Sequence, residues 1–230
     1  MKIAIVCSTY YRPDNRSLFY LERAMRSVYN QTFKDYQVYL IGDDYANKGQ
    51  FQKIANKYKV RSVNLPESIE RQKYAFGTYP LFCSGGLTPA LKGIEMALAD
   101  GYEYICHLDH DDWWEPSHLE YINHVIEQYK PLFICTLATY YCGLLPSYEP
   151  SGDVMQYVTY PGCCVLSSSC IRYSGTKLRF RDVFAETGKA YPADADLWQR
   201  LSDEVKIKDG YIVTAVTCHH DEEAYSLKTK

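Results

Sequence analysis

The chain has 230 residues, of which 47% are hydrophobic and 23% are charged, and its formal net charge is −3. This composition is that of an ordinary globular protein and excludes a long disordered chain. The small negative charge argues against a protein that binds nucleic acid or anionic lipid through bulk positive charge. The apolar runs are far shorter than the roughly 20 residues of a membrane-spanning helix. We therefore expect one domain, with no nucleic-acid partner and no membrane span.

The predicted elements alternate between strands and helices through the first half of the chain, which is typical of a mainly parallel α/β sheet. In order, they are strand 3–7, helix 18–28, strand 36–41, helix 50–58, strand 61–65, loop 66–88, a helix that begins at Thr88-Pro89 and ends before Gly101, strand 102–108, and a helix after Pro116. The less regular second half contains strand 132–139, strand 163–166, helix 196–201 and strand 210–216. The loop 66–88 is long enough to be a functional lid.

The cysteine content indicates a reduced protein. Nine cysteines are present, an odd number that cannot pair completely within one chain. There is no Cys-x-x-Cys pair, and Cys163 and Cys164 are adjacent, which is unfavourable for a disulfide framework. Cys7, Cys106 and Cys135 lie in apolar runs, where cysteine behaves as a small hydrophobic residue. We therefore predict a cytoplasmic location.

Acidic residues follow two of the predicted strands. Asp43 and Asp44 come after strand 36–41, and Asp109, Asp111 and Asp112 come after strand 102–108. Because open α/β sheets bind ligands at the carboxyl ends of their strands, we expect these carboxylates to share a cleft. Crowded carboxylates repel one another unless a cation neutralises them or some hold protons. Since hard oxygen ligands favour Mg²⁺ or Mn²⁺, the pattern indicates a metal–diphosphate site at the Asp-x-Asp motif.

Each of these residues also has an ordinary structural interpretation. Aspartates after strands often form turns or cap helices. Tyr10 is compatible with core packing as well as with stacking on a base, and the pair Trp113-Trp114 with core packing as well as with a sugar platform. Asp194 and Asp196 precede an apolar helical segment, and acidic residues there stabilise a helix N-terminus. The residues alone leave these alternatives open.

Five motifs follow one another in a set order: Ser8-Thr9-Tyr10-Tyr11-Arg12, the helical stretch 21–33, Asp43-Asp44, the Asp-x-Asp segment Leu108–Pro116, and the late acidic segment Asp194–Leu201. In their order and spacing they resemble the inverting family 2 glycosyltransferases, and the resemblance covers residues 3–201. It implies the GT-A fold, a single Rossmann-like α/β domain with a mainly parallel central sheet flanked by helices. Within that domain, about 1–112 would bind the nucleotide sugar, and about 113–230 would form a less regular acceptor-binding half.

The resemblance also implies a reaction. It predicts a metal-dependent inverting glycosyltransferase that moves a sugar from a nucleotide-diphosphate sugar, with a UDP-sugar favoured, to a hydroxyl of a glycan or other acceptor. Mn²⁺ or Mg²⁺ would be the cofactor. Asp194 lies where the family keeps its general base, Asp111 where it has a metal ligand, and Asp109 where the ribose or the metal shell is contacted. The nucleotide pocket would include Tyr10, stacked on the base, Asp44, accepting a hydrogen bond from it, and Ser8, Thr9 and Arg12 as lining residues.

The C-terminal part of the chain and the helix before the Asp-x-Asp strand add two expectations. In some related enzymes a histidine from a closing C-terminal segment completes the metal shell, which suggests a ligand from the pair His219-His220, with His219 as the candidate and the choice between the two left open; a solvated or strand-end histidine is the alternative. The family commonly has an arginine where this chain has Pro89-Ala90-Leu91. Arg71 or Lys73 would then replace it as the cation that holds the donor.

Two other function classes compete with this interpretation. A metal-dependent phosphohydrolase would build a two-metal site from the residues His107, Asp109, His110, Asp111 and Asp112. That class leaves Tyr10, Asp44 and Asp194 without a role. A catalytically inactive nucleotide-sugar-binding module is compatible with the missing donor arginine and with Ala193, where the family often has a glutamate before the base.

Overall fold

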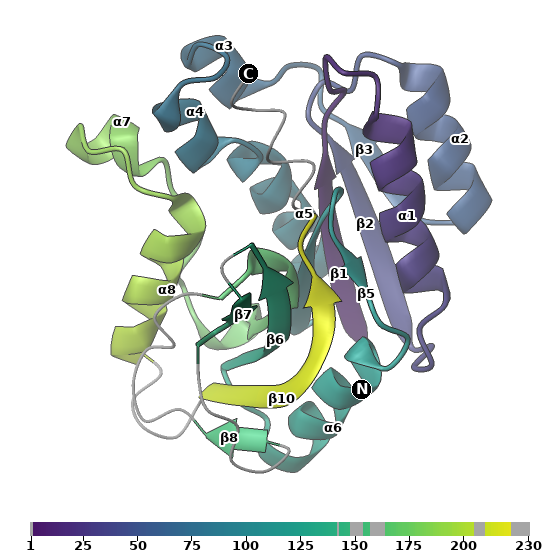
Figure 1. Ribbon diagram of the computed structural model, residues 1–230, viewed down its shortest axis with the longest axis vertical. Helices are drawn as coiled ribbons and strands as arrows, with labels where there is room; N and C mark the ends of the chain where they lie inside the picture. Colours follow the sequence, from purple (N-terminus) through teal and green to yellow (C-terminus); the bar gives the residue numbers. More distant parts are fainter. Residues whose placement is uncertain (1, 142, 148–153, 157–163, 205–209, 222–230) are drawn as a thin grey trace.

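The computed structural model of the chain describes residues 2–141, 143–147, 154–156, 164–204 and 210–221. These residues form a ten-stranded, curled sheet with helices on both faces (Figure 1). The strands are β1 (Ile3–Thr9), β2 (Tyr36–Gly42), β3 (Arg61–Asn64), β4 (Tyr104–Asp109), β5 (Trp113–Trp114), β6 (Phe133–Tyr140), β7 (Gly143–Leu145), β8 (Val154–Gln156), β9 (Ser169–Arg172) and β10 (Gly210–His219). The helices are α1 (Ser17–Tyr29), α2 (Lys48–Tyr58), α3 (Ile69–Lys73), α4 (Tyr79–Ser84), α5 (Leu87–Ala99), α6 (His118–Tyr129), α7 (Val183–Thr187) and α8 (Ala193–Glu204), with 3-10 turns η1 (Leu166–Ser168) and η2 (Tyr173–Gly175).

The sheet is parallel in its first half and mixed in its second. Its strand order is β3-β2-β1-β4-β9-β6-β10-β5, with β7 paired to β6 and β8 paired to β10. The strands β3, β2, β1 and β4 run parallel to one another, and β6 runs parallel to β10. Short β9 lies antiparallel between β4 and β6 and joins the two parallel groups into one sheet. All four strands of the first group therefore end at one edge.

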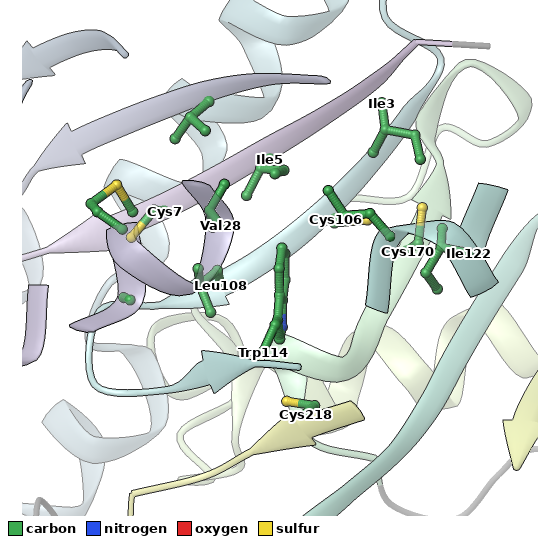
Figure 2. Packing of buried hydrophobic residues seen from close by; sticks show 14 of the residues in the cluster. Ile3, Ile5, Cys7, Val28, Cys106, Leu108, Trp114, Ile122, Cys170 and Cys218 are labelled. Carbon is green, nitrogen blue, oxygen red and sulfur yellow. The ribbon is translucent and has the colours of Figure 1, made fainter. Parts of the chain in front are cut away.

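Alternate side chains of the strands build a core on each face of the sheet. Along β1, Ile3, Ile5 and Cys7 pack with residues of α1, α2 and α6, whereas Ala4 and Val6 pack with residues of α5 and α8. Figure 2 shows the first of these cores around Trp114. This arrangement of two helical layers over a central sheet confirms the predicted α/β fold class, and the burial of Cys7, Cys106 and Cys135 confirms their packing role.

Helix α5 lies unusually close to β1. A Cβ atom at Gly93 would come within 2.4 Å of a Val6 side-chain carbon, so only glycine permits this approach. The helix ends before Gly101, whose φ of +85° is favourable only for glycine. The sequence predicts this end, because Gly101 lies just beyond the last helical residue.

Two predicted segments differ from the structure. The long loop 66–88 contains the short helices α3 and α4, whose ends are held by tertiary contacts: Glu70 accepts hydrogen bonds from both the backbone N–H and the hydroxyl of Thr88. In the predicted strand 163–166, Cys163 lies outside the described residues, and Leu166 begins η1. The strand in this region comes later, as β9. Of the helices that the structure describes, none has the length and hydropathy needed to cross a bilayer.

Candidate functional site

A pocket of about 220 Å³ opens at the carboxyl edge of β1 and β2. The backbone N–H of Asp43 donates to the carbonyl of Thr9 over 2.7 Å, which joins the loops that follow these two strands. The residues around the pocket come from these loops and from α3 with the segment before it: Tyr10, Tyr11, Asp43, Asp44, Ala46, Ser68, Arg71 and Gln72. The pocket therefore lies where strands of the first parallel group end, and the aspartates that follow β4 are not among its lining residues.

The pocket contains an aromatic face, a cation and an unsatisfied acid. The guanidinium carbon of Arg71 lies 3.5 Å from the ring centroid of Tyr10, and its Nε donates to Asp43 Oδ2 over 3.1 Å. The other oxygen of Asp43 and the hydroxyl of Ser68 are buried without a hydrogen-bond partner among the described residues. Because buried polar atoms are almost always paired, these two are the atoms a ligand would satisfy.

The two aspartates of the β2 end occupy different positions. Asp43 is 3% exposed in the pocket wall, whereas the Asp44 side chain is exposed at the rim. Asp44 has a φ of +46°, a left-handed conformation that turns the chain away from the strand. Sequence reasoning predicted that Asp44 contacts the base, and both Asp44 and Asp43 line the pocket. No local sequence signal separates Asp43 from Asp44, because the direction in which the chain turns after the strand decides which of the two adjacent side chains is buried.

Ser8 and Thr9 lie beside the pocket rather than in its wall. Ser8 is paired with Asp109 across the β1–β4 ladder. Thr9 is 2% exposed, and its hydroxyl oxygen is buried without a partner among the described residues. Their positions connect the base pocket to the acidic loop after β4.

The acidic loop contains one structural carboxylate and two that face the site. Asp112 is fully buried and accepts hydrogen bonds from the Ser167 hydroxyl and from His220 Nδ1, at 2.5 and 2.9 Å. The backbone N–H of Asp109 donates to the same Ser167 oxygen over 2.9 Å. Burial, together with the charges of Asp112 and Asp111, raises the pKa of Asp109 to about 8. The loop therefore concentrates negative charge that a cation would relieve.

Two arginines reach Asp111 from the β1–α1 region. Arg12 Nη1 lies 3.4 Å from Asp111 Oδ2, and Arg23 Nη2 donates to the Asp111 carbonyl over 2.5 Å. Arg12 was expected to line the base pocket, but the structure brings it to the Asp-x-Asp motif. Arg71, one of the two substitutes proposed for the missing donor arginine, lies in the base pocket, while Lys73 pairs with Asp182 over 2.7 Å.

The structure does not bring His219 to the acidic loop. Both of its ring nitrogens have hydrogen-bond partners, Nδ1 with Thr139 at 3.1 Å and Nε2 with Glu115 at 3.0 Å, and its ring is stacked on Trp113. His220 is the histidine that contacts the loop, through Asp112. Its pKa is raised, against the opposing effect of burial, by that hydrogen bond and by the charges of the neighbouring aspartates.

Asp194 lies in the first turn of α8, within electrostatic reach of the acidic loop. Its charge contributes to the raised pKa of Asp109, and burial raises the pKa of Asp194 itself. Two residues later, Asp196 accepts hydrogen bonds from Arg181 at 2.7 and 2.9 Å and from Arg200 at 2.7 Å. Asp196 therefore anchors the helix through its side chain, whereas Asp194 Oδ1 accepts a hydrogen bond from the backbone N–H of Ala195.

The donor chemistry of the acidic loop suits a hard divalent ion. Asp109 and Asp111 offer carboxylate oxygens, and Mg²⁺ or Mn²⁺ commonly takes one or two carboxylates and completes its shell with water and phosphate oxygens. In the part of the chain that the structure describes, no group of three or more His, Cys, Asp or Glu side chains is arranged to hold a metal. Asp109 and Asp111 thus offer two of the oxygen ligands that such an ion takes.

The two remaining histidines near the loop have packing roles. His107 is buried, with Nε2 2.9 Å from the Tyr173 hydroxyl, and burial lowers its pKa to about 3. His110 packs edge-on against Tyr10, with ring centroids 5.3 Å apart. Neither arrangement resembles the two-metal site of a phosphohydrolase. Trp114 is likewise buried in the core.

Comparison with known proteins gives one sequence relative and several structural ones. No family model matches the chain. It is 30% identical over 241 residues to the uncharacterized glycosyltransferase R139 of Acanthamoeba polyphaga mimivirus. The aligned region covers 97% of this chain and 95% of that protein.

The structural relatives are crystal structures of S. aureus TarS. Residues 1–349 of TarS match with a TM-score of 0.69 at 14% identity, covering 99% of this chain and 63% of that one. The complex of the same fragment with UDP matches with a TM-score of 0.64 at 13% identity, covering 95% and 60%. The chain thus spans less than two thirds of these TarS fragments. At this level of identity the likeness shows the fold, which is that of a GT-A domain.

Proposed function

The chain belongs to the glycosyltransferases, and we propose that it is a metal-dependent, inverting enzyme that transfers a sugar from a UDP-sugar to a hydroxyl of a glycan or another acceptor. TarS, which shares its fold, has been crystallised with UDP and with UDP-GlcNAc. The cytoplasmic location stays a prediction from the cysteine content.

The observation that carries the proposal is the unsatisfied acceptor in the strand-end pocket. A uracil ring has an N3–H donor between two carbonyl acceptors. Asp43 Oδ1 is a buried acceptor without a partner among the described residues, and Ser68 and Arg71 supply donors beside it. The ring of Tyr10 and the guanidinium of Arg71 provide flat faces for stacking on the base. We assign recognition of the base to Asp43, with Asp44 at the rim.

The acidic loop would hold the ion and the diphosphate. Asp109 and Asp111 would bind Mn²⁺ or Mg²⁺. His220 contacts the same loop through its hydrogen bond with Asp112. When bound, such an ion stabilises the charge that develops on the departing diphosphate and orients the donor. Since Asp109 has a raised pKa, ion binding would be coupled to loss of its proton.

Asp194 would act as the general base. Burial raises its pKa, which increases its affinity for the proton of an acceptor hydroxyl. Asp196, the other acid in this turn of α8, is already paired with two arginines. A single base that activates the acceptor on the face opposite the leaving group gives inversion by direct displacement.

The test is UDP binding by calorimetry, with Mn²⁺ and again with EDTA. We expect tight binding only with Mn²⁺. In the same buffer, Asp43→Asn is expected to lower UDP affinity by roughly tenfold to a hundredfold, because it removes a charged acceptor from a buried hydrogen bond. The matched variant Asp44→Asn, on the exposed rim, is expected to change affinity by less than about threefold.

Three outcomes would contradict parts of the proposal. UDP binding that EDTA leaves unchanged would remove the metal dependence. A larger effect at Asp44 than at Asp43 would reverse the assignment of the base contact. Failure to bind UDP, GDP or dTDP with Mn²⁺ present would refute the donor site itself.

A further inference from the structure

The short helix α3 sends its side chains to different parts of the fold. Glu70 accepts hydrogen bonds from the backbone N–H and the hydroxyl of Thr88, at the start of α5. The next residue, Arg71, lies over the ring of Tyr10 in the strand-end pocket and donates a hydrogen bond to Asp43. Helix α3 is therefore held between α5 and the wall of the pocket.

The end of α3 is tied to the start of α7 through one carboxylate. Lys73 Nζ and the Tyr74 hydroxyl each donate to Asp182 Oδ2 over 2.7 Å. The Tyr74 ring also packs edge-on against Phe184, with ring centroids 5.7 Å apart. Asp182 caps α7 as well, since its Oδ1 accepts from the backbone N–H of Ala185 over 3.0 Å. Burial raises the pKa of this carboxyl, but the hydrogen bonds outweigh burial and lower it, so Asp182 carries its charge between the two helices.

The residue before Asp182 continues the connection to α8. Arg181 donates two parallel hydrogen bonds to Asp196, from Nε to Oδ2 over 2.9 Å and from Nη2 to Oδ1 over 2.7 Å. A bidentate pair of this kind fixes the orientation of its partner as well as the distance. Asp196 lies in the first turn of α8, as does Asp194, the proposed base. A continuous set of contacts thus runs from the pocket to the turn that carries Asp194.

The four residues Lys73, Tyr74, Arg181 and Asp182 form a strap between the pocket and α8. The two helices that the strap joins, α3 and α7, have five residues each, and isolated helices shorter than about 12–15 residues are marginal in water. Tertiary contacts therefore set the positions of both. Figure 1 shows α7 outside the central sheet, with α4 beside it. A shift of α3 is passed to α7 through Asp182, and from there to α8 through Arg181.

We propose that the strap couples the two sides of the site: Asp182 is a positioning residue, and a nucleotide bound against Arg71 orders α7 and the first turn of α8 through it. This inference rests on the proposed function. A nucleobase in the pocket adds contacts to α3 and so restricts its motion. Because the strap ties α3 to α7, local opening of α7 and of the first turn of α8 then becomes less frequent. Asp194 is thereby held in place when the donor is present.

Hydrogen–deuterium exchange in the presence of Mn²⁺, with and without saturating UDP, tests the coupling. In wild type we expect UDP to slow amide exchange in residues 68–74, and to slow it in residues 183–198 by roughly fivefold or more. Lys73→Met/Tyr74→Phe removes both hydrogen bonds to Asp182 and leaves Asp182 as the cap of α7. In this variant we expect protection of residues 68–74 alone. A residue that only stabilised the fold would change exchange equally with and without UDP.

The matched control is Lys57→Met/Tyr58→Phe. Lys57 and Tyr58 are also adjacent and also donate to a single carboxylate, that of Glu22, but they do so between α2 and α1. We expect the wild-type response to UDP in both segments. Asp182→Asn takes the place of the strap variant if that variant does not fold. Asparagine caps a helix as well as aspartate does, but it lacks the charge that pairs with Lys73, so the response of residues 183–198 should fall by at least about half.

The outcomes distinguish the coupling from the proposed function. If wild type fails to bind UDP with Mn²⁺ in calorimetry, the proposed function fails. If wild type binds UDP and residues 183–198 are not protected, the coupling is wrong. Full protection of residues 183–198 in Lys73→Met/Tyr74→Phe, or in Asp182→Asn, would overturn it too, because UDP would then act on α8 directly. An equal loss in the control would reduce the strap to one stabilising contact among many.

Discussion

The region around the strand-end pocket and the region around α8, which we propose as the donor side and the acceptor side, are held by different kinds of interaction. On the donor side, residues at the ends of β1, β2 and β4 are positioned by the parallel ladder, which sets Ser8 opposite Asp109 and joins Asp43 to Thr9. On the acceptor side, α8 lies outside the sheet and is tied by the ion pairs of Asp196 (Figure 1). Backbone ladders fix position whatever the side chains are, whereas ion pairs depend on particular residues. The donor side is therefore the part of the site less sensitive to substitution.

One set of contacts joins the two sides. Lys73 Nζ and the Tyr74 hydroxyl, at the end of α3, each donate a hydrogen bond to Asp182 Oδ2 over 2.7 Å. The adjacent Arg181 pairs with Asp196 in α8. Since α3 also carries Arg71 of the strand-end pocket, this helix connects the pocket to α8.

The largest expected effect tests whether the acceptor side carries the chemistry. Asp194→Asn is expected to lower sugar transfer by at least a hundredfold while UDP affinity stays within about twofold, because it removes the base and leaves the donor pocket intact. Turnover and calorimetry measure the two effects. Asp203→Asn, on an exposed position of the same helix, is the control. Wild-type transfer by Asp194→Asn would assign the base elsewhere, and absence of turnover in wild type as well would favour a binding module.

The second prediction tests whether ion pairs hold the acceptor side. Asp196→Ala is expected to lower the free energy of unfolding by about 3 kcal/mol, because it leaves Arg181 and Arg200 without their buried partner. Urea denaturation measures this loss. A comparable change at Asp203, which is exposed on the same helix, should cost less than about 0.5 kcal/mol. Equal stability of the two variants would show that α8 is held by its apolar face alone.

The smallest expected effect concerns the donor side and is read from pH. Because the folded protein raises the pKa of Asp109 from 3.8 to about 8, the folded state holds a proton that the unfolded chain releases. Stability is therefore lost as the pH rises through this window. Asp109→Asn should raise Tm by about 2–4 °C at pH 8, with a gain that shrinks toward pH 4. A pH-independent gain would mean that Asp109 is not the titrating group.

Sequence reasoning predicted the donor edge well for a physical reason. Polar residues that directly follow buried, parallel strands must meet at one edge, so Tyr10, the Asp43-Asp44 pair and Asp109 could be brought together without coordinates. It did not distinguish Asp43 from Asp44, because the left-handed turn at Asp44 has no glycine or asparagine to mark it. Contacts that follow from the strand register could be predicted, and contacts that depend on the conformation of a single turn could not.

The different positions of His219 and His220 could not be predicted for a similar reason. Alternation along a regular strand would assign His219 and His220 to opposite faces, but β10 has register irregularities against β6 between Val213 and Val216 and again before Cys218. Each irregularity shifts the side chains that follow. The sequence also did not reveal α3 and α4, since their stability comes from distant partners such as Thr88 and Asp182 rather than from local propensity.

The hydrogen bonds of Asp112 have a consequence for the order in which the site forms. The base pocket uses residues up to Gln72, so all of its parts exist early in synthesis. The hydrogen-bond partners of the buried Asp112 are synthesised later, first Ser167 and then His220 and Asp221. Contacts between residues so far apart in sequence form slowly, and they form late when the chain emerges from its N-terminus. A nascent chain therefore contains every residue of the strand-end pocket before it contains the partners that hold the acidic loop, and those contacts are complete only when β10 joins the sheet.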